Sequence, residues 1–339
     1  MKHLILARTD AIGDLILTIP VARAIKEQHP EISLTMLVSR YVVPLIRKEP
    51  YLDQIITIPG RDLHEPGRVN AFSRDLRRLG ADAILFFYPR PWLALAAWSA
   101  RIEQRIGTGR RFYSLLFNRR VNLGRKNSGL HELELNYRLA ESVFPELKRF
   151  EPHLHKDHEA IEAARLLMED VGAIGGRYVV VHPLSHGSAP NWRLNRYAEL
   201  TRQLAQAGIE CLVTGSELER DLIEAAFGAL DPRIHLVAGR TDLPTLVALI
   251  RGARLLVSGS TGPIHIASAV GTFAVGIYPP ESALAATRWG PRGQANKLFA
   301  PPVHALKGDL QAAMETIGVD EVARFIGRHL DADNVTKAG

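Results

Sequence analysis

Residues 255–272 read LLVSGSTGPIHIASAVGT, and this stretch decides how the rest of the chain is interpreted. An apolar run ends in a turn of small residues, and Pro263 follows this turn. Proline is favoured in the first turn of a helix, where its missing N–H would have no partner, so we expect a helix to begin at this point. Backbone N–H groups at a helix start, together with the helix dipole, attract anions. We therefore predict a phosphate-binding turn at Thr261 and Gly262, with His265 as a further donor.

Predicted strands and helices alternate on both sides of this turn, which indicates parallel sheets covered by helices. The first series begins with a strand at 3–7 and a helix at 14–28, and a second series restarts with a helix at 158–171. We therefore predict an α/β protein of two Rossmann-like domains, with ligands at the carboxyl ends of the strands in a cleft between them. The predicted strands cover residues 3–7, 34–38, 55–58, 83–87, 178–183, 210–214, 234–237, 255–257 and 274–278.

Length and composition favour two domains in a reducing compartment. The chain has 339 residues, more than a single core usually holds, and we place the domains at residues 1–155 and 156–339, with the last helix free to pack back on the first. The apolar part of the N-terminus is too short for a signal peptide, and no apolar run is long enough to span a bilayer. The single cysteine, Cys211, lies in an apolar stretch and is predicted as a core thiol. We expect a cytoplasmic location.

Basic side chains gather between residues 101 and 126, where Glu103 is the only acid. Such a field attracts phosphate-bearing partners or an anionic membrane surface, although a solvated face has the same composition. Nucleic acid is disfavoured as a partner because no recognition motif or aromatic platform accompanies the arginines. The basic side chains are Arg101, Arg105, Arg110, Arg111, Arg119, Arg120, Arg125 and Lys126.

A series of short motifs, taken in order, resembles glycosyltransferase family 9, the lipopolysaccharide heptosyltransferases. Residues 5–20 read ILARTDAIGDLILTIP and resemble the start of the family. Val181-His182-Pro183, Trp192 with the YAEL of residues 197–200, Val213-Thr214-Gly215 and the TGPIHIA of residues 261–267 follow in the expected order.

This resemblance extends from Lys2 to about Leu330 and implies a GT-B fold, with the acceptor on the N-terminal domain and the nucleotide-sugar on the C-terminal one. It implies an inverting transfer without a metal, in which heptose passes from ADP-heptose to a lipopolysaccharide core or a related anionic, lipid-linked glycan. Such an acceptor would bring the protein into peripheral contact with the inner membrane. No cofactor beyond the donor co-substrate is implied.

The resemblance assigns the acceptor side to the first domain. Asp14 matches the aspartate that the family uses as its base, a role that inversion in one displacement requires. The alternative is that Asp14 only caps the first helix. Asp10 either competes for the role of base or tunes Asp14 through its like charge. The other acceptor-side residues that we predict are Gly13, Arg110, Arg111 and His131, the last with a solvated helix start as its alternative.

Two departures from the family pattern concern the donor. Pro190 stands where the family has a lysine, so either Arg193 or the helix start at Gly262 neutralises the leaving diphosphate. Ser260 stands where an aspartate precedes Thr-Gly-Pro in the family. Gly215 and Glu217 are predicted to reach the ribose, with helix capping by Glu217 or Glu219 as the alternative. The donor-binding residues that we predict are Ser185, Gly187, Arg193, Gly215, Glu217, Ser260, Thr261, Gly262 and His265.

Other functions remain open from the sequence. A family 9 transferase using another nucleotide-sugar, a nucleotide-sugar epimerase and a non-catalytic nucleotide-sugar binding protein share these motifs. An NAD-dependent oxidoreductase is disfavoured because no G-x-G-x-x-G follows the first strand. Asp331-Ala332-Asp333 resembles a DxD metal motif but is expected in a polar tail, so no metal site is predicted.

Overall fold

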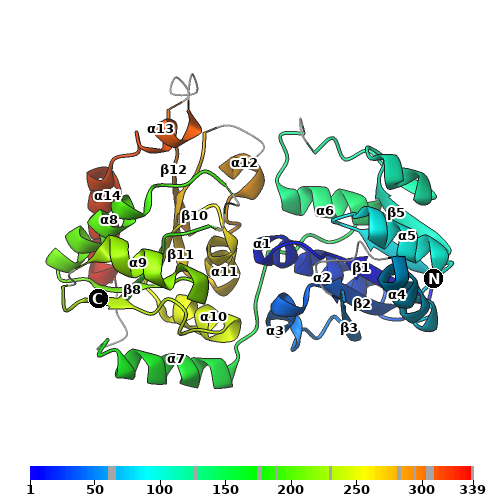
Figure 1. Ribbon diagram of the computed structural model, residues 1–339, viewed down its shortest axis with the longest axis horizontal. Coiled ribbons are helices and arrows are strands. Elements are labelled where there is room, and N and C mark those ends of the chain that lie inside the picture. The colour runs from blue at the N-terminus through cyan, green and yellow to red at the C-terminus, as the bar shows by residue number, and fades with distance from the viewer. Residues whose placement is uncertain are drawn as a thin grey trace. The chain divides into compact units, whose positions relative to one another are not determined.

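The computed structural model divides into two compact units, Met1–His153 and Leu154–Gly339 (Figure 1). The division lies two residues before the predicted domain boundary. The structure describes residues 1–59, 66–125, 128–173, 178–185, 187, 189–228, 231–280, 284–293, 295–302 and 309–336. Lys126 of the basic segment lies outside these residues.

The first unit is built on a parallel sheet of six strands in the order β3-β2-β1-β4-β5-β6. Its strands are β1 (His3–Ala7), β2 (Ser33–Val38), β3 (Gln54–Thr57), β4 (Ala83–Phe86), β5 (Gln104–Thr108) and β6 (Arg119–Val121). Its helices are α1 (Ile12–Ile16), α2 (Ile19–Gln28), α3 (Val43–Ile46), α4 (Pro66–Arg78), α5 (Pro91–Ser99) and α6 (Glu132–Glu141), with 3₁₀ turns η1 (Arg40–Val42) and η2 (Phe112–Leu116).

The second unit repeats this topology in a parallel sheet of order β12-β11-β10-β7-β8-β9. Its strands are β7 (Tyr178–His182), β8 (Glu210–Val213), β9 (Ile234–Leu236), β10 (Leu255–Gly259), β11 (Phe273–Ile277) and β12 (Asn296–Phe299). Its helices are α7 (His158–Asp170), α8 (Leu194–Gln206), α9 (Arg220–Phe227), α10 (Leu243–Gly252), α11 (Gly262–Val270), α12 (Ala286–Trp289), α13 (Leu310–Met314) and α14 (Val319–Thr336), with the 3₁₀ turn η3 (Glu217–Glu219).

The predicted fold class of two Rossmann-like α/β domains is confirmed. Numbered within its own unit, each sheet has the order 3-2-1-4-5-6, in which the first strand is central and the chain reverses direction across the sheet beside it. The nine predicted strands are all present. The central strands are buried on both faces, as their continuous apolar runs require.

Three strands, β5, β6 and β12, were not predicted. The sequence of β5 is QRIGT and that of β6 is RRV, so neither carries the apolar run or the alternation by which a strand is recognised. Strands β6 and β12 lie at the edges of their sheets, where one side has no neighbouring strand and charged side chains are tolerated. Their place depends on pairing with the next strand rather than on local sequence.

The predicted helix at 14–28 ends at Gln28 as expected, but its start and its continuity are wrong. Helix α1 already begins at Ile12, and the chain breaks at Leu17 and Thr18 before α2 starts. Pro20 causes this break, because its ring would clash with the carbonyl four residues earlier and it has no N–H to donate. Pro20 lies instead in the first turn of α2, where these defects cost little.

Two further predictions about the second unit have clear outcomes. Cys211 is fully buried, and burial raises the pKa of its thiol to about 12, so it is a core residue. Helix α14 places Val322, Ile326 and Leu330 in the core of this unit beside α8. Residues 331–333 belong to α14, so the expected polar tail at this point is wrong. None of the helices in the described residues is long and apolar enough to cross a membrane.

Candidate functional site

Several of the predicted site residues lie at the topological switch points of the two sheets, where open α/β sheets bind their ligands. In the first unit this point lies between β1 and β4, and the loop after β1 carries Asp10, Gly13 and Asp14. In the second it lies between β7 and β10, whose loops carry Ser185 and Thr261.

Arg8 organises the edge of the first unit, although the sequence analysis assigned it no role. It follows β1 directly and is 2% exposed. Its guanidinium donates a hydrogen bond to the carboxylate of Asp14. Its Nε also forms an ion pair with Asp10 Oδ1 at 2.9 Å, but the two atoms are not aligned for a hydrogen bond. Burial alone would lower the pKa of Arg8, but the charges of Asp10, Asp14 and Glu132 outweigh it and leave that pKa above its usual value. Arg8 therefore stays charged.

Asp10 and Asp14 form an unequal acidic pair on this arginine. Burial raises the pKa of Asp10 to about 8, although the positive charge of Arg8 lowers it. The charge of Asp14 and a hydrogen bond to Asp14 raise the pKa of Asp10 further. Near neutral pH the carboxyl group of Asp10 is therefore protonated and donates a hydrogen bond to Asp14. Asp14 lies in the first turn of α1 and caps nothing, since Ala11 occupies the N-cap position. Asp14 is therefore not the N-cap, although it lies in the first turn, where the helix dipole favours an acid.

A second buried acid completes the cluster. Glu132, at the start of α6, is fully buried, with Oε1 3.4 Å from Arg8 Nη1 and 3.3 Å from Arg125 Nη1. Asn136, one turn later, accepts a hydrogen bond of 3.3 Å from Arg8 and donates one of 2.8 Å to the carbonyl of Leu17. Arg8 and Arg125 therefore share three acidic side chains, of which Asp10 holds a proton near neutral pH.

We predict that Asp10→Asn makes the protein more stable in alkaline solution. With a folded pKa near 8 and a reference value of 3.8, the folded chain keeps a proton that the unfolded chain releases. The stability of the wild type therefore falls as pH rises through this window and levels off above it. Asparagine removes the ionisation but keeps a donor and an acceptor, so the variant should gain a few kcal/mol at pH 8 and little at pH 4. Urea unfolding across this range measures it, and parallel pH curves for both proteins would contradict it.

The other acceptor-side residues fall into two groups. Gly13 is buried within α1, beside Asp14. His131 is the N-cap of α6, where its Nδ1 accepts a hydrogen bond of 3.1 Å from the N–H of Leu133. The alternative of a helix start holds for His131, which is half-buried, whereas the next residue, Glu132, is fully buried. Arg110 and Arg111 are exposed beyond β5, which lies two strands from β1, or about 10 Å at the usual strand spacing.

In the second unit, hydrogen bonds join the ends of three neighbouring strands. Ser258 in β10 donates a bond of 3.1 Å to the carbonyl of His182, the last residue of β7. The His182 ring in turn lies 2.9 Å from the hydroxyl of Thr214, which follows β8. The loops after β7, β8 and β10 therefore start from one fixed edge, and all nine predicted donor-binding residues follow these three strands.

The predicted phosphate-binding turn has the expected geometry. Thr261 is the N-cap of α11, Gly262 is its first residue and Pro263 lies in its first turn. The Thr261 side chain makes no capping bond, and both Thr261 and Gly262 are partly exposed. His265 is 4% exposed in the same helix. Ser260 hydrogen-bonds the buried phenol of Tyr278.

Asn191 supports this turn and was missed from the sequence. It donates 2.9 Å to the carbonyl of Pro183, while its Oδ1 accepts 2.7 Å from Tyr197 and 2.9 Å from the N–H of Trp192. Its amide lies against the backbone of Gly259, where an added Cβ would be 2.6 Å from Asn191 Oδ1. Asn191 thus fixes the loop after β7 to the end of β10. The neighbouring Trp192 motif was the only sequence signal near it.

We predict that Gly259→Ala destabilises the protein by about 1–3 kcal/mol and weakens nucleotide binding, because the new methyl group must displace Asn191. Gly327→Ala in α14 is the matched control, since an added Cβ there meets nothing within 4 Å. That control should be neutral or slightly stabilising, as alanine favours a helix. Thermal unfolding and calorimetric ADP binding measure both effects. Equal stability of the two variants would contradict the role given to this contact.

The loop after β7 holds two predicted donor residues. Ser185 donates a weak bond of 3.4 Å to the carbonyl of Ala189. Gly187 has φ +72°, a left-handed conformation that a side chain would strain. Arg193, the candidate for the missing lysine, is the N-cap of α8; its side chain is 68% exposed, with Nε 3.9 Å from Glu315. A pair so exposed and distant holds the guanidinium only weakly.

The turn after β8 separates the two acids that the sequence left undecided. Glu219 is the capping residue: it is buried, and its Oε2 accepts 2.8 Å from the N–H and 2.9 Å from the hydroxyl of Ser216. Glu217 is 64% exposed and pairs with Arg220. Gly215 precedes both and accepts a backbone bond of 2.9 Å from Gly239. Glu217 is therefore the acid that remains accessible to a ligand.

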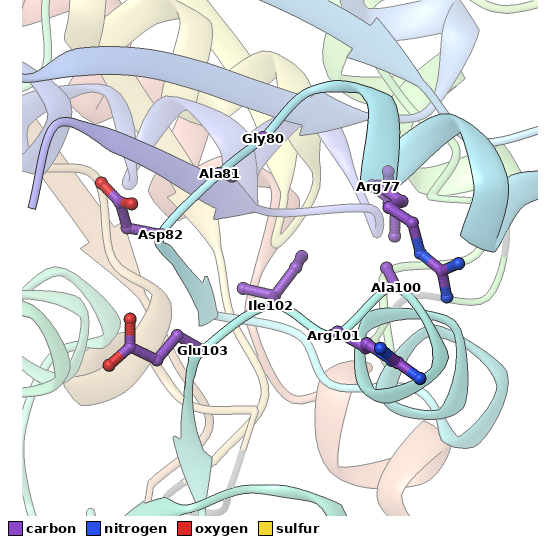
Figure 2. A pocket seen from close by; sticks show the side chains of 9 residues that line it. Arg77, Gly80, Ala81, Asp82, Ala100, Arg101, Ile102 and Glu103 are labelled. Carbon is purple, nitrogen blue, oxygen red and sulfur yellow. The ribbon is translucent and has the colours of Figure 1, made fainter.

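A separate pocket of about 400 Å³ lies at the opposite edge of the first sheet. It is lined by residues that precede β4 and β5 and by the ends of α4 and α5. Figure 2 shows the carboxylates of Asp82 and Glu103 on one side and the guanidinium groups of Arg77 and Arg101 on the other. Since ligands bind at the carboxyl ends of strands, this pocket is not the candidate site. Across the described residues, acids, histidines and the cysteine form no group of three that could hold a metal.

Comparison with known proteins gives relatives of the same architecture. A Haemophilus influenzae protein named "Putative glycosyltransferase" is 26% identical over 342 residues, covering 96% of this chain and 97% of the relative. The structure of E. coli ADP-heptose lps heptosyltransferase II matches with a TM-score of 0.79 at 19% identity, covering 98% of this chain and all of that one. E. coli heptosyltransferase WaaC with ADP-2-deoxy-2-fluoro heptose matches with a TM-score of 0.71 at 17% identity, covering 96% and 99%.

These structural matches show a GT-B-like fold and, at such low identity, no more than the fold. The family of this chain is shown by a different finding. The family model described as Glycosyltransferase family 9 (heptosyltransferase) matches residues 69–306, which is more than half of the chain. Together with the order of the motifs along the sequence, this match shows that the chain belongs to glycosyltransferase family 9, the heptosyltransferases.

Proposed function

We propose that this glycosyltransferase transfers heptose from ADP-heptose to an anionic, lipid-linked glycan such as a lipopolysaccharide core, with inversion and without a metal. The observation that carries the proposal is the cluster at the end of β1, in which the buried Arg8 bonds the carboxylate of Asp14 and pairs with Asp10. The same sheet edge in the second unit carries a helix start suited to a diphosphate. Relatives of this fold act on or bind ADP-heptose compounds by name, which favours heptose over other sugars.

In the proposed step, Asp14 takes the proton of the acceptor hydroxyl while that oxygen attacks the anomeric carbon of the donor. The bond from this carbon to the diphosphate oxygen breaks, and ADP leaves with its electron pair. Asp10 cannot serve as the base near neutral pH because it already holds a proton. Its hydrogen bond and the charge of Arg8 instead hold Asp14 in one orientation.

On the donor side, the start of α11 would stabilise the charge that develops on the leaving diphosphate. Gly262 contributes a backbone N–H, and His265 lies in the same turn. Arg193 is exposed and weakly held, so it is able to supply the charge that the family lysine provides. Glu217 is proposed to reach the ribose because Glu219 is committed to its cap.

Calorimetric binding of ADP, UDP, GDP and dTDP without added metal tests the proposal, followed by turnover of ADP-heptose with glycolipid extracts. Preference for ADP and transfer to a glycolipid would support it. Preference for another base would keep the family chemistry and discard ADP-heptose. Conversion of the donor without an acceptor would favour an epimerase, and binding without any transfer would favour a non-catalytic binding protein.

We predict that Gly262→Leu raises the dissociation constant for ADP by at least about tenfold. A side chain at this position would occupy the space in which a diphosphate approaches the backbone, and would separate it from the N–H groups. Circular dichroism and thermal unfolding check that the variant is folded. Asp14→Asn, whose change lies in the other unit, is the matched control and should bind ADP as the wild type does. An unaltered constant for Gly262→Leu would exclude this turn from the nucleotide site.

A further inference from the structure

Helix α5 is apolar on all sides although only one side is buried. Its sequence, PWLALAAWS, has no charged residue. With α4 it covers one face of the first sheet, where Leu93 and Ala97 are fully buried (Figure 1). Leu95 and Trp98 point away from this core and are 42% and 53% exposed. A surface helix normally carries polar side chains on its outer face, so the apolar outer face of α5 is unexplained by the fold.

The 3₁₀ turn η2 extends this apolar surface. It packs against α5 and exposes Phe112 and Leu115, at 80% and 76%. Residues three apart eclipse each other in a 3₁₀ helix, so these two side chains share a side of η2. Leu95 and Trp98 have the same spacing and share a side of α5. These four side chains, on two elements in contact, are called the α5–η2 patch.

Exposed arginines flank both elements of the patch in the sequence. Arg101 follows α5, Arg110 and Arg111 precede η2, and Arg119 and Arg120 follow it, and all five are exposed. None of them forms an ion pair with another residue in the part of the chain that the structure describes. Glu103 is the only acid between residues 101 and 120. The four apolar side chains therefore belong to a segment with a strong excess of exposed positive charge.

We propose that the α5–η2 patch docks this protein on the surface of an anionic phospholipid bilayer. Tryptophan and phenylalanine enter the boundary between headgroups and acyl chains, and arginines beside them pair with lipid phosphates. A second copy of the chain fits less well, because a two-fold contact would set the same arginines against each other. The inference goes beyond the proposed reaction, since it depends on the surface alone and on neither donor nor acceptor.

The chain offers its own contrast to this surface. Leu218 and Leu222, on η3 and α9, are 87% and 61% exposed, fractions similar to those of Phe112 and Leu115 on η2. Three exposed acids, Glu217, Asp221 and Glu224, outnumber the single basic neighbour, Arg220. An anionic bilayer should repel this pair. Similar apolar exposure with opposite local charge makes it a matched control.

Sedimentation of the full-length protein with vesicles tests the proposal, using phosphatidylcholine alone and an equal mixture of phosphatidylcholine and phosphatidylglycerol. We expect binding to the mixed vesicles that weakens with salt, and at least about tenfold weaker binding to phosphatidylcholine. Phe112→Ser/Leu115→Ser and Arg101→Gln/Arg119→Gln should each reduce binding about tenfold or more. Leu218→Ser/Leu222→Ser should bind as the wild type does. All changed side chains are exposed, and circular dichroism confirms folding.

Three results would overturn the docking surface. The first is that the wild-type protein binds neither kind of vesicle, and the second is that the α5–η2 variants bind as well as the wild type does. The third is that the protein binds no vesicles but forms a concentration-dependent dimer, which Phe112→Ser/Leu115→Ser abolishes. ADP binding is measured on the same samples and separates this inference from the proposed function. A protein that binds ADP but no vesicle loses only the docking surface, whereas vesicle binding without ADP binding sinks only the proposed function.

Discussion

Asp14→Asn should lower kcat by a factor of about 10²–10⁴ while leaving ADP affinity within about twofold of the wild type. Asparagine matches the carboxylate in shape and can still accept a hydrogen bond from Arg8, but it cannot take a proton from the acceptor hydroxyl. The neighbouring acid cannot replace it, because the pKa of Asp10 is about 8 and its carboxyl group is therefore protonated at neutral pH. Turnover with saturating donor and acceptor measures the effect.

Asp75→Asn is the matched control for this variant. Asp75 is in the same unit and also pairs with an arginine, Arg78, but its side chain is 64% exposed and lies on α4. It should leave kcat unchanged. If Asp14→Asn retained full turnover, the base would have to be another group, and the cluster at the end of β1 would be a structural feature only.

The sequence was sufficient for the fold because the central strands are specified locally. Strand β10 is a continuous apolar run followed by small residues and a proline, and each of these features acts within a few residues. Strands β5 and β6 depend instead on neighbours that are distant in the sequence. The break before Pro20 was readable in principle, since proline cannot continue a helix from the preceding turn.

The candidate site divides in the same way. The turn at Thr261 and Gly262 is contiguous in the sequence, and its position at the start of a helix was predicted from those residues. The cluster around Arg8 joins the loop after β1 to α6, more than 120 positions away, and its acids acquire their properties only from that contact and from burial. An arginine that follows an apolar strand directly was the available signal. Asn191 gave even less, because its role depends on the close approach of Gly259.

Arg8→Met should be the most destabilising of these substitutions, with a loss of about 3–5 kcal/mol at neutral pH. Methionine fills much of the same volume but leaves Asp14 and the buried Glu132 without their shared cation, and an uncompensated buried charge is costly. Arg125 still pairs with Glu132, so the loss should fall mainly on Asp14 and Asp10. Urea unfolding measures the free energy.

The dependence on pH distinguishes this electrostatic loss from a packing defect. Without Arg8, the pKa of the remaining carboxyl groups rises in the folded state, so the folded variant binds more protons than the unfolded chain. Its deficit should therefore shrink as the solution is acidified toward pH 5, whereas a cavity would cost the same at each pH. Arg165→Met is the control: Arg165 contacts both Glu162 and Glu169, but on an exposed face of α7 where such pairs contribute little. A loss for Arg8→Met no larger than that of the control, or one that ignores pH, would contradict the buried charge network.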